Sequence, residues 1–435
     1  MNRFSLIQLY FFCFFVQFSF AQNFTTIEID KSQNLVIPNS DSTGKKTIFP
    51  VMLYSFLDWQ ETQPNGFWDE IDDWGINIVY SWEKNAYDLI ANEAQKQNVS
   101  VMGHHEYANN KPGLMALPDE PIGAGTATVS EIETIVKKRG KNYIYMLNHD
   151  VSPYYFRIRN NNLINGFSNK DNCTWCGRRK GTLESYDEYN QYADIISFDY
   201  YPFSSKGIID NKVEDFGKSS VGEFTALLKN NYPTKPIWAV IQTLWFSPYT
   251  APYEGHIINS KIIRNLTFDA IINGADGVSF FGHGQTTQYS KKEGYEFLQG
   301  KDVAIWKNTL NQCYELKVLQ ESYDKVLLEN NLINYVNSKY GYALKKVKNS
   351  NKYYLLLVNY LNDVNNINIK SSNLPINMNN FKVTKIGKYQ YPPLNYLNLP
   401  AESVDLTKEF KILKFKNGNL DLQLAPYGVA IISFE

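Results

Sequence analysis

Two adjacent carboxylates, Asp119 and Glu120, lie between prolines at the end of an apolar run, in LMALPDEP. A carboxyl that is partly buried beside a second carboxylate is harder to ionise, because both conditions disfavour its charged form. This property suits a general acid, so we expect Glu120 to donate a proton and Asp119 to assist it. If the pair only capped a turn, the apolar run before it would be unexplained.

A second catalytic group is expected among the residues that follow other apolar runs. Breaking a glycosidic bond needs a proton donor beside the leaving oxygen and a second group facing the anomeric carbon. Asp199, in ISFDYYP, is the leading candidate for a base or stabiliser; alternatively, it orients an arginine or a backbone amide. Gln242, in AVIQTLW, cannot be a nucleophile, but its amide can hydrogen-bond a sugar hydroxyl or an N-acetyl group.

Histidine and aromatic side chains gather in the same kind of position. Four of the 5 histidines follow apolar runs, and the chain is rich in aromatic residues, with 31 Tyr, 26 Phe and 8 Trp. Aromatic rings offer flat apolar faces that suit sugar rings, although most of them fill cores. We expect the substrate to be bound by Trp59, Trp82, His104, His105, His149, Tyr200, Tyr201, Gln242, Trp245 and His283.

Two short motifs raise the possibility of a metal, and neither supports one. His104 and His105 precede Glu106, but adjacent strand residues point apart and the H-E-x-x-H spacing is absent. We expect one of these two histidines to hydrogen-bond a sugar hydroxyl and the other to pack against the wall of the predicted barrel. Cys173 and Cys176 form a single C-x-x-C, which cannot supply a four-thiolate zinc site. A local disulfide or two reduced thiols is expected there, and no metal or cofactor is predicted.

The candidate residues all follow short apolar runs that alternate with helical patterns. Eight near-continuous apolar strands separated by helices are typical of a (β/α)8 barrel, although the third link is short for a helix. In such a barrel the active site lies at the C-terminal ends of the strands, where these residues would meet. The predicted strands are 47–57, 76–82, 99–106, 113–121, 143–150, 194–202, 236–245 and 277–284.

The chain divides into four predicted parts. Residues 1–21 have an arginine, an apolar core too short to span a bilayer and a small-residue end, which predicts a cleaved signal peptide and a secreted or periplasmic protein. Residues 22–46 are an N-terminal segment with possible β structure, and 47–322 form the α/β barrel. Residues 323–435 alternate with period two and contain the hairpin signal KNGN, so an antiparallel β-sandwich is expected.

Composition excludes some partners. The formal net charge is −1, which argues against an electrostatic nucleic-acid binder. After the signal peptide no segment is apolar and long enough to predict a membrane span. A carbohydrate substrate is the expected partner, and the sequence does not predict an oligomeric state.

Four blocks resemble (β/α)8 glycoside hydrolases of the broad retaining-glycosidase clan, in a secreted bacterial branch with a C-terminal β-sandwich. They are Asp-Glu-Pro after the fourth strand, DYYP, IWAVIQTLW and RNLTFDAIINGADGVSFF. The resemblance covers roughly residues 45–320 and implies that Glu120 is the acid/base. Asp119 and Gln242 depart from the usual Asn and Glu of that clan.

The Asp-Glu pair also resembles that of substrate-assisted N-acetylhexosaminidases. There the Asp steadies the acetamido group that acts as internal nucleophile, and the Glu protonates the leaving group. The resemblance implies that Tyr200 or Tyr201, with Trp245, would clamp the acetamide.

The sequence therefore predicts an exported glycoside hydrolase acting on a poly- or oligosaccharide, with Glu120, Asp119 and Asp199 catalytic. A substrate-assisted N-acetylhexosaminidase is the first alternative. A non-catalytic glycan-binding barrel is a second, because the usual seventh-strand Glu is missing. A polysaccharide lyase is a third, for which only Arg157, Arg159, Arg178 and Arg179 suggest a basic cleft.

Overall fold

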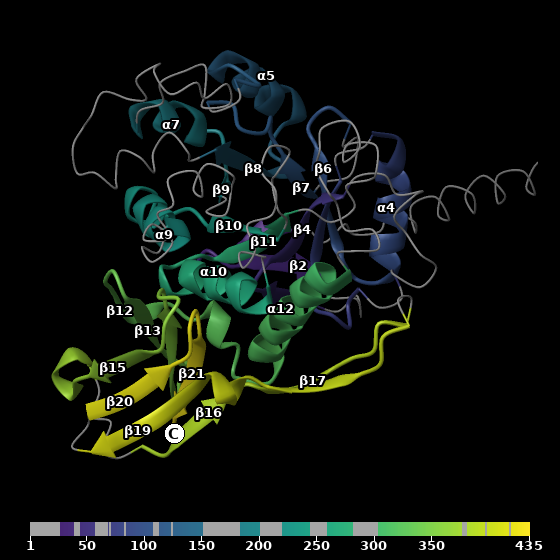
Figure 1. Cartoon of the computed structure of the whole chain (residues 1–435). Coiled ribbons are helices and arrows are strands. Elements are labelled where there is room, and N and C mark those ends of the chain that lie inside the picture. Colours follow the sequence, from purple (N-terminus) through teal and green to yellow (C-terminus); the bar gives the residue numbers. More distant parts are fainter. Residues whose placement is uncertain are drawn as a thin grey trace, which may run out of the picture.

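The computed structural model shows a barrel with helices around it and antiparallel sheets packed against one side (Figure 1). The structure describes residues 27–38, 44–56, 68, 71–81, 84–107, 113–122, 125–150, 183–200, 220–243, 259–281, 303–375, 381–395, 398–416 and 419–435.

Eight parallel strands close into a barrel, as the sequence predicts. Each predicted strand range contains one observed strand, because strands buried on both faces read as continuous apolar runs. The strands are β4 (Val51–Phe56), β5 (Ile78–Ser81), β6 (Ser100–His104), β7 (Gly113–Ala116), β8 (Tyr143–Asp150), β9 (Ile195–Asp199), β10 (Ile237–Gln242) and β11 (Gly277–Phe281).

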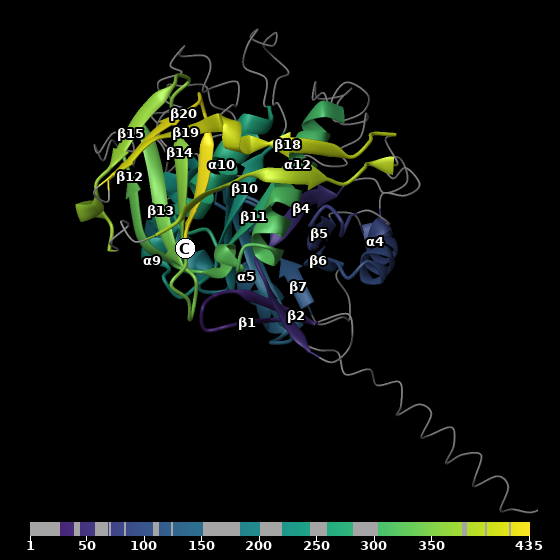
Figure 2. The same ribbon diagram turned by 90° about the horizontal axis from the view of Figure 1, so that it is seen from below.

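Helices cover the outside of the barrel (Figure 2). Two of them begin at side-chain caps that satisfy free backbone N–H groups: Thr128 and Glu131 form a capping box, and the Asn259 side chain accepts from the Ile262 N–H. The helices are α4 (Lys84–Lys96), α5 (Val129–Arg139), α7 (Leu183–Asn190), α9 (Ser220–Asn231), α10 (Ser260–Ile272) and α12 (Val303–Glu321).

The barrel interior is filled by side chains at alternate strand positions, since successive residues face opposite sides. A small N-terminal sheet of β1 (Glu28–Ile29), β2 (Leu35–Pro38) and β3 (Lys45–Ile48) closes the end at which the strands begin. The interior cluster consists of Leu35, Ile37, Ile48, Met52, Tyr54, Ile78, Tyr80, Met102, Leu114, Ala116, Met146, Ile195, Trp238 and Val240.

The C-terminal part is a β-sandwich, as predicted. Its two sheets enclose an apolar core, and the larger sheet packs its other face against α10 of the barrel. The five-stranded sheet contains β12 (Asn331–Val336), β13 (Tyr340–Lys346), β14 (Tyr353–Asn359), β21 (Val429–Phe434) and β16 (Val383–Ile386). The three-stranded sheet contains β15 (Asn365–Ile369), β20 (Asn419–Leu424) and β19 (Phe410–Lys416), the last two paired across the KNGN stretch. A separate hairpin, β17 (Lys388–Tyr391) and β18 (Glu402–Asp405), reaches α12.

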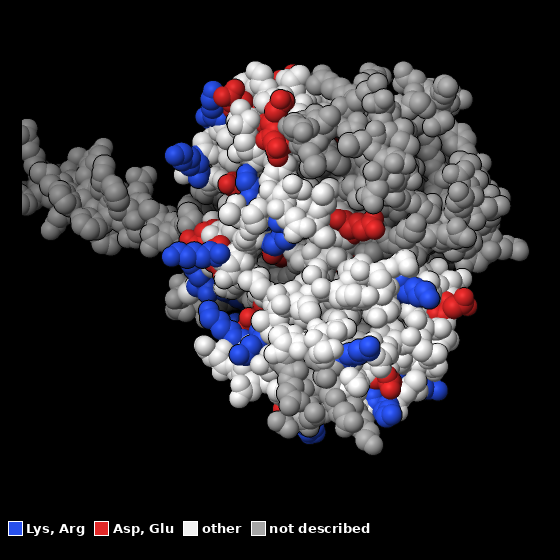
Figure 3. Space-filling view, turned by 90° about the vertical axis from the view of Figure 1, so that its left-hand side faces the viewer, with Lys and Arg blue, Asp and Glu red and all other residues white. Residues whose placement is uncertain are grey.

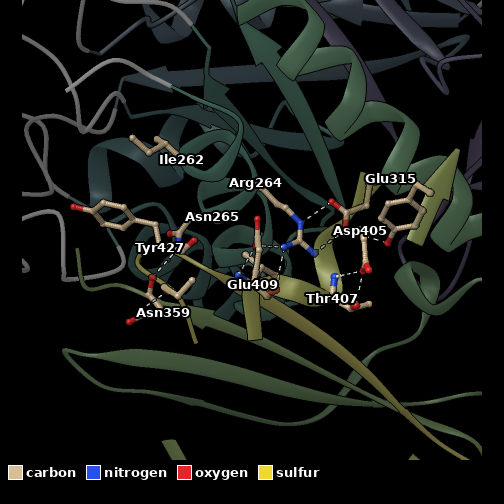
Figure 4. Close-up of polar contacts among 12 residues, drawn as sticks. Ile262, Arg264, Asn265, Glu315, Asn359, Asp405, Thr407, Glu409 and Tyr427 are labelled. Atoms are coloured by element: carbon tan, nitrogen blue, oxygen red, sulfur yellow. Dashed lines mark hydrogen bonds and ion pairs between the residues drawn. The ribbon is translucent and has the colours of Figure 1, made fainter. Parts of the chain in front are cut away.

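A buried polar cluster fastens the two parts together (Figure 4). The Arg264 guanidinium of α10 donates to both carboxylate oxygens of Glu315 at 2.8 Å and to Glu409 Oε2 at 2.7 Å. The neighbouring Asn265 amide donates to the backbone oxygens of Asn359 and Tyr427. The polar residues of the RNLTFDAIING block therefore serve domain packing, at least at these two positions.

Candidate active site at the mouth of the barrel

The Asp119–Glu120 pair lies just beyond the end of β7. This strand ends at Ala116, but the chain continues along β8, with hydrogen bonds from Leu117 N to Met146 O and from Glu120 N to Asn148 O. Glu120 has a φ of +47°, which a non-glycine residue adopts only when its surroundings hold it there. The strand has therefore ended before the pair, as is required if both carboxyls are to lie at the mouth.

Asp119 reaches the barrel interior. Its Oδ1 accepts a hydrogen bond from the Tyr54 hydroxyl of β4 at 2.9 Å and another from the Asn148 amide of β8 at 2.9 Å. Tyr54 and Asn148 are each only 2% exposed. Two neutral donors on different strands thus fix the orientation of this carboxylate.

The electrostatics show which groups lie close to Asp119. Burial, and then the Asp119 carboxylate, raise the pKa of Tyr54 well above its ordinary value, with further contributions from Tyr80 and Asp199. Burial and Asp119 also raise the pKa of Tyr80. Both phenols consequently stay protonated, and the charges of Asp119 and Asp199 act on the same hydroxyl of Tyr54.

Asp199 and Gln242 are the last residues of two neighbouring strands, β9 and β10. Both are buried, and strand alternation places them on the interior side with Ile195 and Val240. The structure thus brings Asp119, Asp199 and Gln242 to the same end of the barrel.

His104 and His105 lie side by side rather than apart. Their ring centroids are 4.0 Å apart, because β6 ends at His104 and the chain turns there. The expectation that these two side chains diverge is therefore wrong. Burial lowers the pKa of His104, and burial with the neighbouring His104 and Arg139 lowers the pKa of His105 to about 4, so both are neutral at pH 7.

His149, which the sequence predicts to bind the sugar, does not face the barrel interior. Its side chain is 1% exposed and lies on the helix side of β8, with Nε2 2.7 Å from Asn190 Oδ1 of α7 and its ring 4.5 Å from Tyr186. The reason is strand alternation: Asn148 occupies the inward position, so His149 faces outward.

Tyr200 also packs on the helix side, with its ring 6.0 Å from that of Phe224 in α9. Cys313 is a buried free thiol of α12. The described stretches hold no group of three or more His, Cys, Asp or Glu placed to bind a metal, and none of their helices is long and apolar enough to cross a bilayer. Several predicted residues lie outside the described residues, namely Trp59, Trp82, Tyr201, Trp245 and His283, as do Cys173 and Cys176.

Tyr54, like Asn148, is a residue of this site to which the sequence alone gave no role. It lies within an apolar strand and reads as core, and it does pack against Tyr80 and Phe281. Its position in the strand could have indicated this role. Tyr54 is two positions after the interior residue Met52 and close to the end of β4, so its hydroxyl lies inside the barrel near the mouth.

Charged residues give the face shown in Figure 3 no dominant sign. On the face shown in Figure 3, basic and acidic side chains occur in the same areas among many uncharged ones. This distribution agrees with the formal net charge of −1.

No protein-family model and no curated protein matches the sequence. Among solved structures, the chain is similar to a noncanonic maltogenic alpha-amylase from Thermotoga neapolitana, with 11% identity, 88% of this chain and 98% of the other covered, and a TM-score of 0.45. It is also similar to a putative alpha-galactosidase from Bacteroides fragilis, with 10% identity, coverage of 94% and 90%, and a TM-score of 0.48. A third similar structure is Amy13B from Eubacterium rectale, with 9% identity, coverage of 89% and 96%, and a TM-score of 0.49.

Proposed function

We propose that this protein is a glycoside hydrolase that cleaves O-glycosidic bonds of a poly- or oligosaccharide. The observation that carries the proposal is the Asp119 carboxylate, held inside the mouth of a parallel barrel by Tyr54 and Asn148 and followed directly by Glu120. Active sites of such barrels lie at this end. Glycosidic cleavage needs a proton donor beside the leaving oxygen and a second group that faces the anomeric carbon, and Glu120 and Asp119 are the candidates for these two roles.

In the proposed reaction Glu120 donates its proton to the glycosidic oxygen as the bond from that oxygen to the anomeric carbon breaks. Asp119 stabilises the positive charge that develops on the sugar, and Asp199 is the candidate base. A water molecule adds its oxygen to the anomeric carbon and gives a proton to Asp199. Exchange with solvent then removes this proton from Asp199 and returns one to Glu120, which restores the acid. Gln242, an amide where a nucleophilic Glu is usual in the clan, would hydrogen-bond the sugar.

A second candidate is a substrate-assisted N-acetylhexosaminidase. It is favoured by the adjacency of Asp119 and Glu120. It is also favoured by the two donors to Asp119, because both are neutral and do not cancel the negative charge that would accept an acetamide N–H. In that reaction the acetamide oxygen attacks the anomeric carbon while Glu120 protonates the leaving oxygen. A thiazoline inhibitor, which resembles the cyclic intermediate, should bind only if this candidate is correct.

The test is a digest of a broad glycan panel, with products identified by mass spectrometry. Wild-type protein should release hydrolysed sugars. Glu120→Gln should reduce turnover by about 10³-fold, a loss of roughly 4 kcal/mol of transition-state stabilisation. Glu133→Gln, which changes a partly exposed carboxyl of α5, serves as the matched control and should keep full activity.

Other outcomes separate the alternatives. Unchanged turnover by Glu120→Gln would reject that residue as the acid. A product that absorbs as an unsaturated uronide would identify a lyase, and binding without any product would identify a non-catalytic glycan-binding barrel.

We further propose export, from the signal-peptide pattern of residues 1–21. N-terminal sequencing of protein recovered from secreted or periplasmic fractions should begin near residue 22.

A further inference from the structure

Asn148 holds both members of the carboxylate pair. Its side-chain amide donates to Asp119 Oδ1 at 2.9 Å, and its backbone oxygen accepts from Glu120 N at 3.0 Å. Since Glu120 has a φ of +47°, this backbone bond also helps to keep the bend that follows β7. One residue of the neighbouring strand β8 therefore sets the position of both carboxyl-bearing residues.

Tyr54 approaches Asp119 from another direction. It belongs to β4, which in the barrel order β4-β5-β6-β7-β8 is separated from β7 by two strands, so its hydroxyl reaches across the interior. Its ring is confined by Tyr80 at 5.0 Å and Phe281 at 5.9 Å between centroids. A donor that is already immobile loses little side-chain entropy when it holds a ligand group in place.

The groups around Asp119 determine its charge. The titratable groups that act on Asp119 or on its phenol partners include Tyr54, Tyr80, Tyr107 and Asp199, and Glu120 is its neighbour in the chain. The Asp119 carboxylate acts electrostatically on the phenols of Tyr54 and Tyr80. Both phenols stay protonated, because burial and Asp119 raise their pKa values. Tyr54 thus remains a hydrogen-bond donor at neutral and acidic pH, and donation to a carboxylate favours the ionised form.

We propose that Tyr54 and Asn148 are positioning residues for the reaction: they hold Asp119 ionised and in one orientation, and Asn148 also fixes the bend at Glu120. This inference rests on the proposed function. Neither residue needs to contact the sugar, because each acts through a carboxyl group.

The test compares Tyr54→Phe with wild type in the full chain, using a panel of 4-nitrophenyl glycosides that includes the N-acetylglucosaminide. Phenylalanine keeps the ring and removes only the hydroxyl. We expect kcat to fall about 10-fold with KM within about twofold, as for the loss of one hydrogen bond to a charged group. The acidic limb of the pH–rate profile should move to higher pH, because Asp119 without this hydrogen bond takes up a proton more readily.

Tyr360→Phe is the matched control. Tyr360 also donates to a buried carboxylate, Asp269 Oδ1 at 2.8 Å, but it lies at the contact between the barrel and the sandwich. This variant should unfold more easily and keep the wild-type pH–rate profile. If Tyr54→Phe behaves in the same way, the positioning role is rejected while the proposed function stands.

A double-mutant cycle provides a readout without turnover. Tyr54→Phe should lower the melting temperature at pH 7 clearly in wild type and by less than half as much in the Asp119→Asn background. Equal losses in the two backgrounds would overturn the inference. A wild-type protein that hydrolyses no glycoside of the panel and no glycan would instead overturn the proposed function.

Discussion

Asn148 and His149 are adjacent on β8, yet only Asn148 reaches the barrel interior. The sequence places both after the fifth apolar run, and nothing local tells which one faces the site. The alternation of the strand decides it, and its phase follows from the apolar residue Met146, which lies inside. The number of positions that separate a residue from a core residue of the same strand was therefore a better guide to its role than its chemical type.

The outward position of His149 predicts a pH dependence of stability. Burial lowers its pKa from 6.5 to about 4, so between these values the unfolded chain binds more protons than the native one. The free energy of unfolding is therefore highest above pH 6.5 and decreases as the pH drops towards 4. His149 contributes roughly 3 kcal/mol to this decrease.

Urea unfolding of His149→Gln at several pH values checks this prediction. The variant should lose less stability than wild type between pH 6.5 and 4. His105 contributes to the fall in wild type as well, since its pKa is also lowered to about 4, so His105→Gln in the same series separates the two. An identical fall in wild type and His149→Gln would contradict the assignment.

At the scale of elements, α10 is a helix that is buried on all sides, so its polar side chains need partners within the protein. Every residue from Ile262 to Ile272 is buried, because the barrel covers one side of the helix and the β-sandwich the other. The polar residues of this helix are therefore paired: Arg264 with Glu315 and Glu409, and Asp269 with Tyr360 and the Gly222 N–H.

Removing one partner of this cluster should be costly. Arg264→Met leaves the Glu315 carboxylate buried without its guanidinium, and we expect a loss of about 3–5 kcal/mol in the free energy of unfolding. Lys307→Met is the control, because its ion pair with Glu402 joins the same two parts of the molecule but is partly exposed. That change should cost less than about 1 kcal/mol in denaturant titrations. Comparable losses for the two variants would show that Arg264 contributes little beyond a surface pair.

The eight strands could be predicted from the sequence because each is a local apolar run. The candidate site could be predicted only in part. Asp119, Glu120 and Asp199 stand at strand ends, which the runs themselves define. The hydrogen bond of Tyr54 joins residues 65 positions apart, and those of Arg264 reach residues 51 and 145 positions away. Contacts of this kind depend on barrel closure and domain packing, which no local pattern contains.

At the scale of the whole molecule, one apolar cluster spans the contact between the barrel and the β-sandwich. A single cluster contains barrel residues such as Val278, helix residues such as Cys313 and sandwich residues such as Leu356 and Ile431. The polar cluster of Arg264 crosses the same contact (Figure 4). The barrel interior and the sandwich each have a further cluster of their own, but the large buried contact between them favours unfolding of the two parts together.

The Cys313 thiol can test this cooperativity. It is fully buried in α12, and burial raises its pKa, so it should not react with Ellman's reagent in the native protein. In a Cys173→Ser, Cys176→Ser variant without the signal segment, Cys313 is the one cysteine left. Its reaction should follow the same denaturant dependence as the loss of secondary structure of the whole chain, measured by circular dichroism. Loss of circular-dichroism signal while the thiol is still protected would show that another part of the molecule unfolds before α12, and that the shared cluster does not make the molecule one unit.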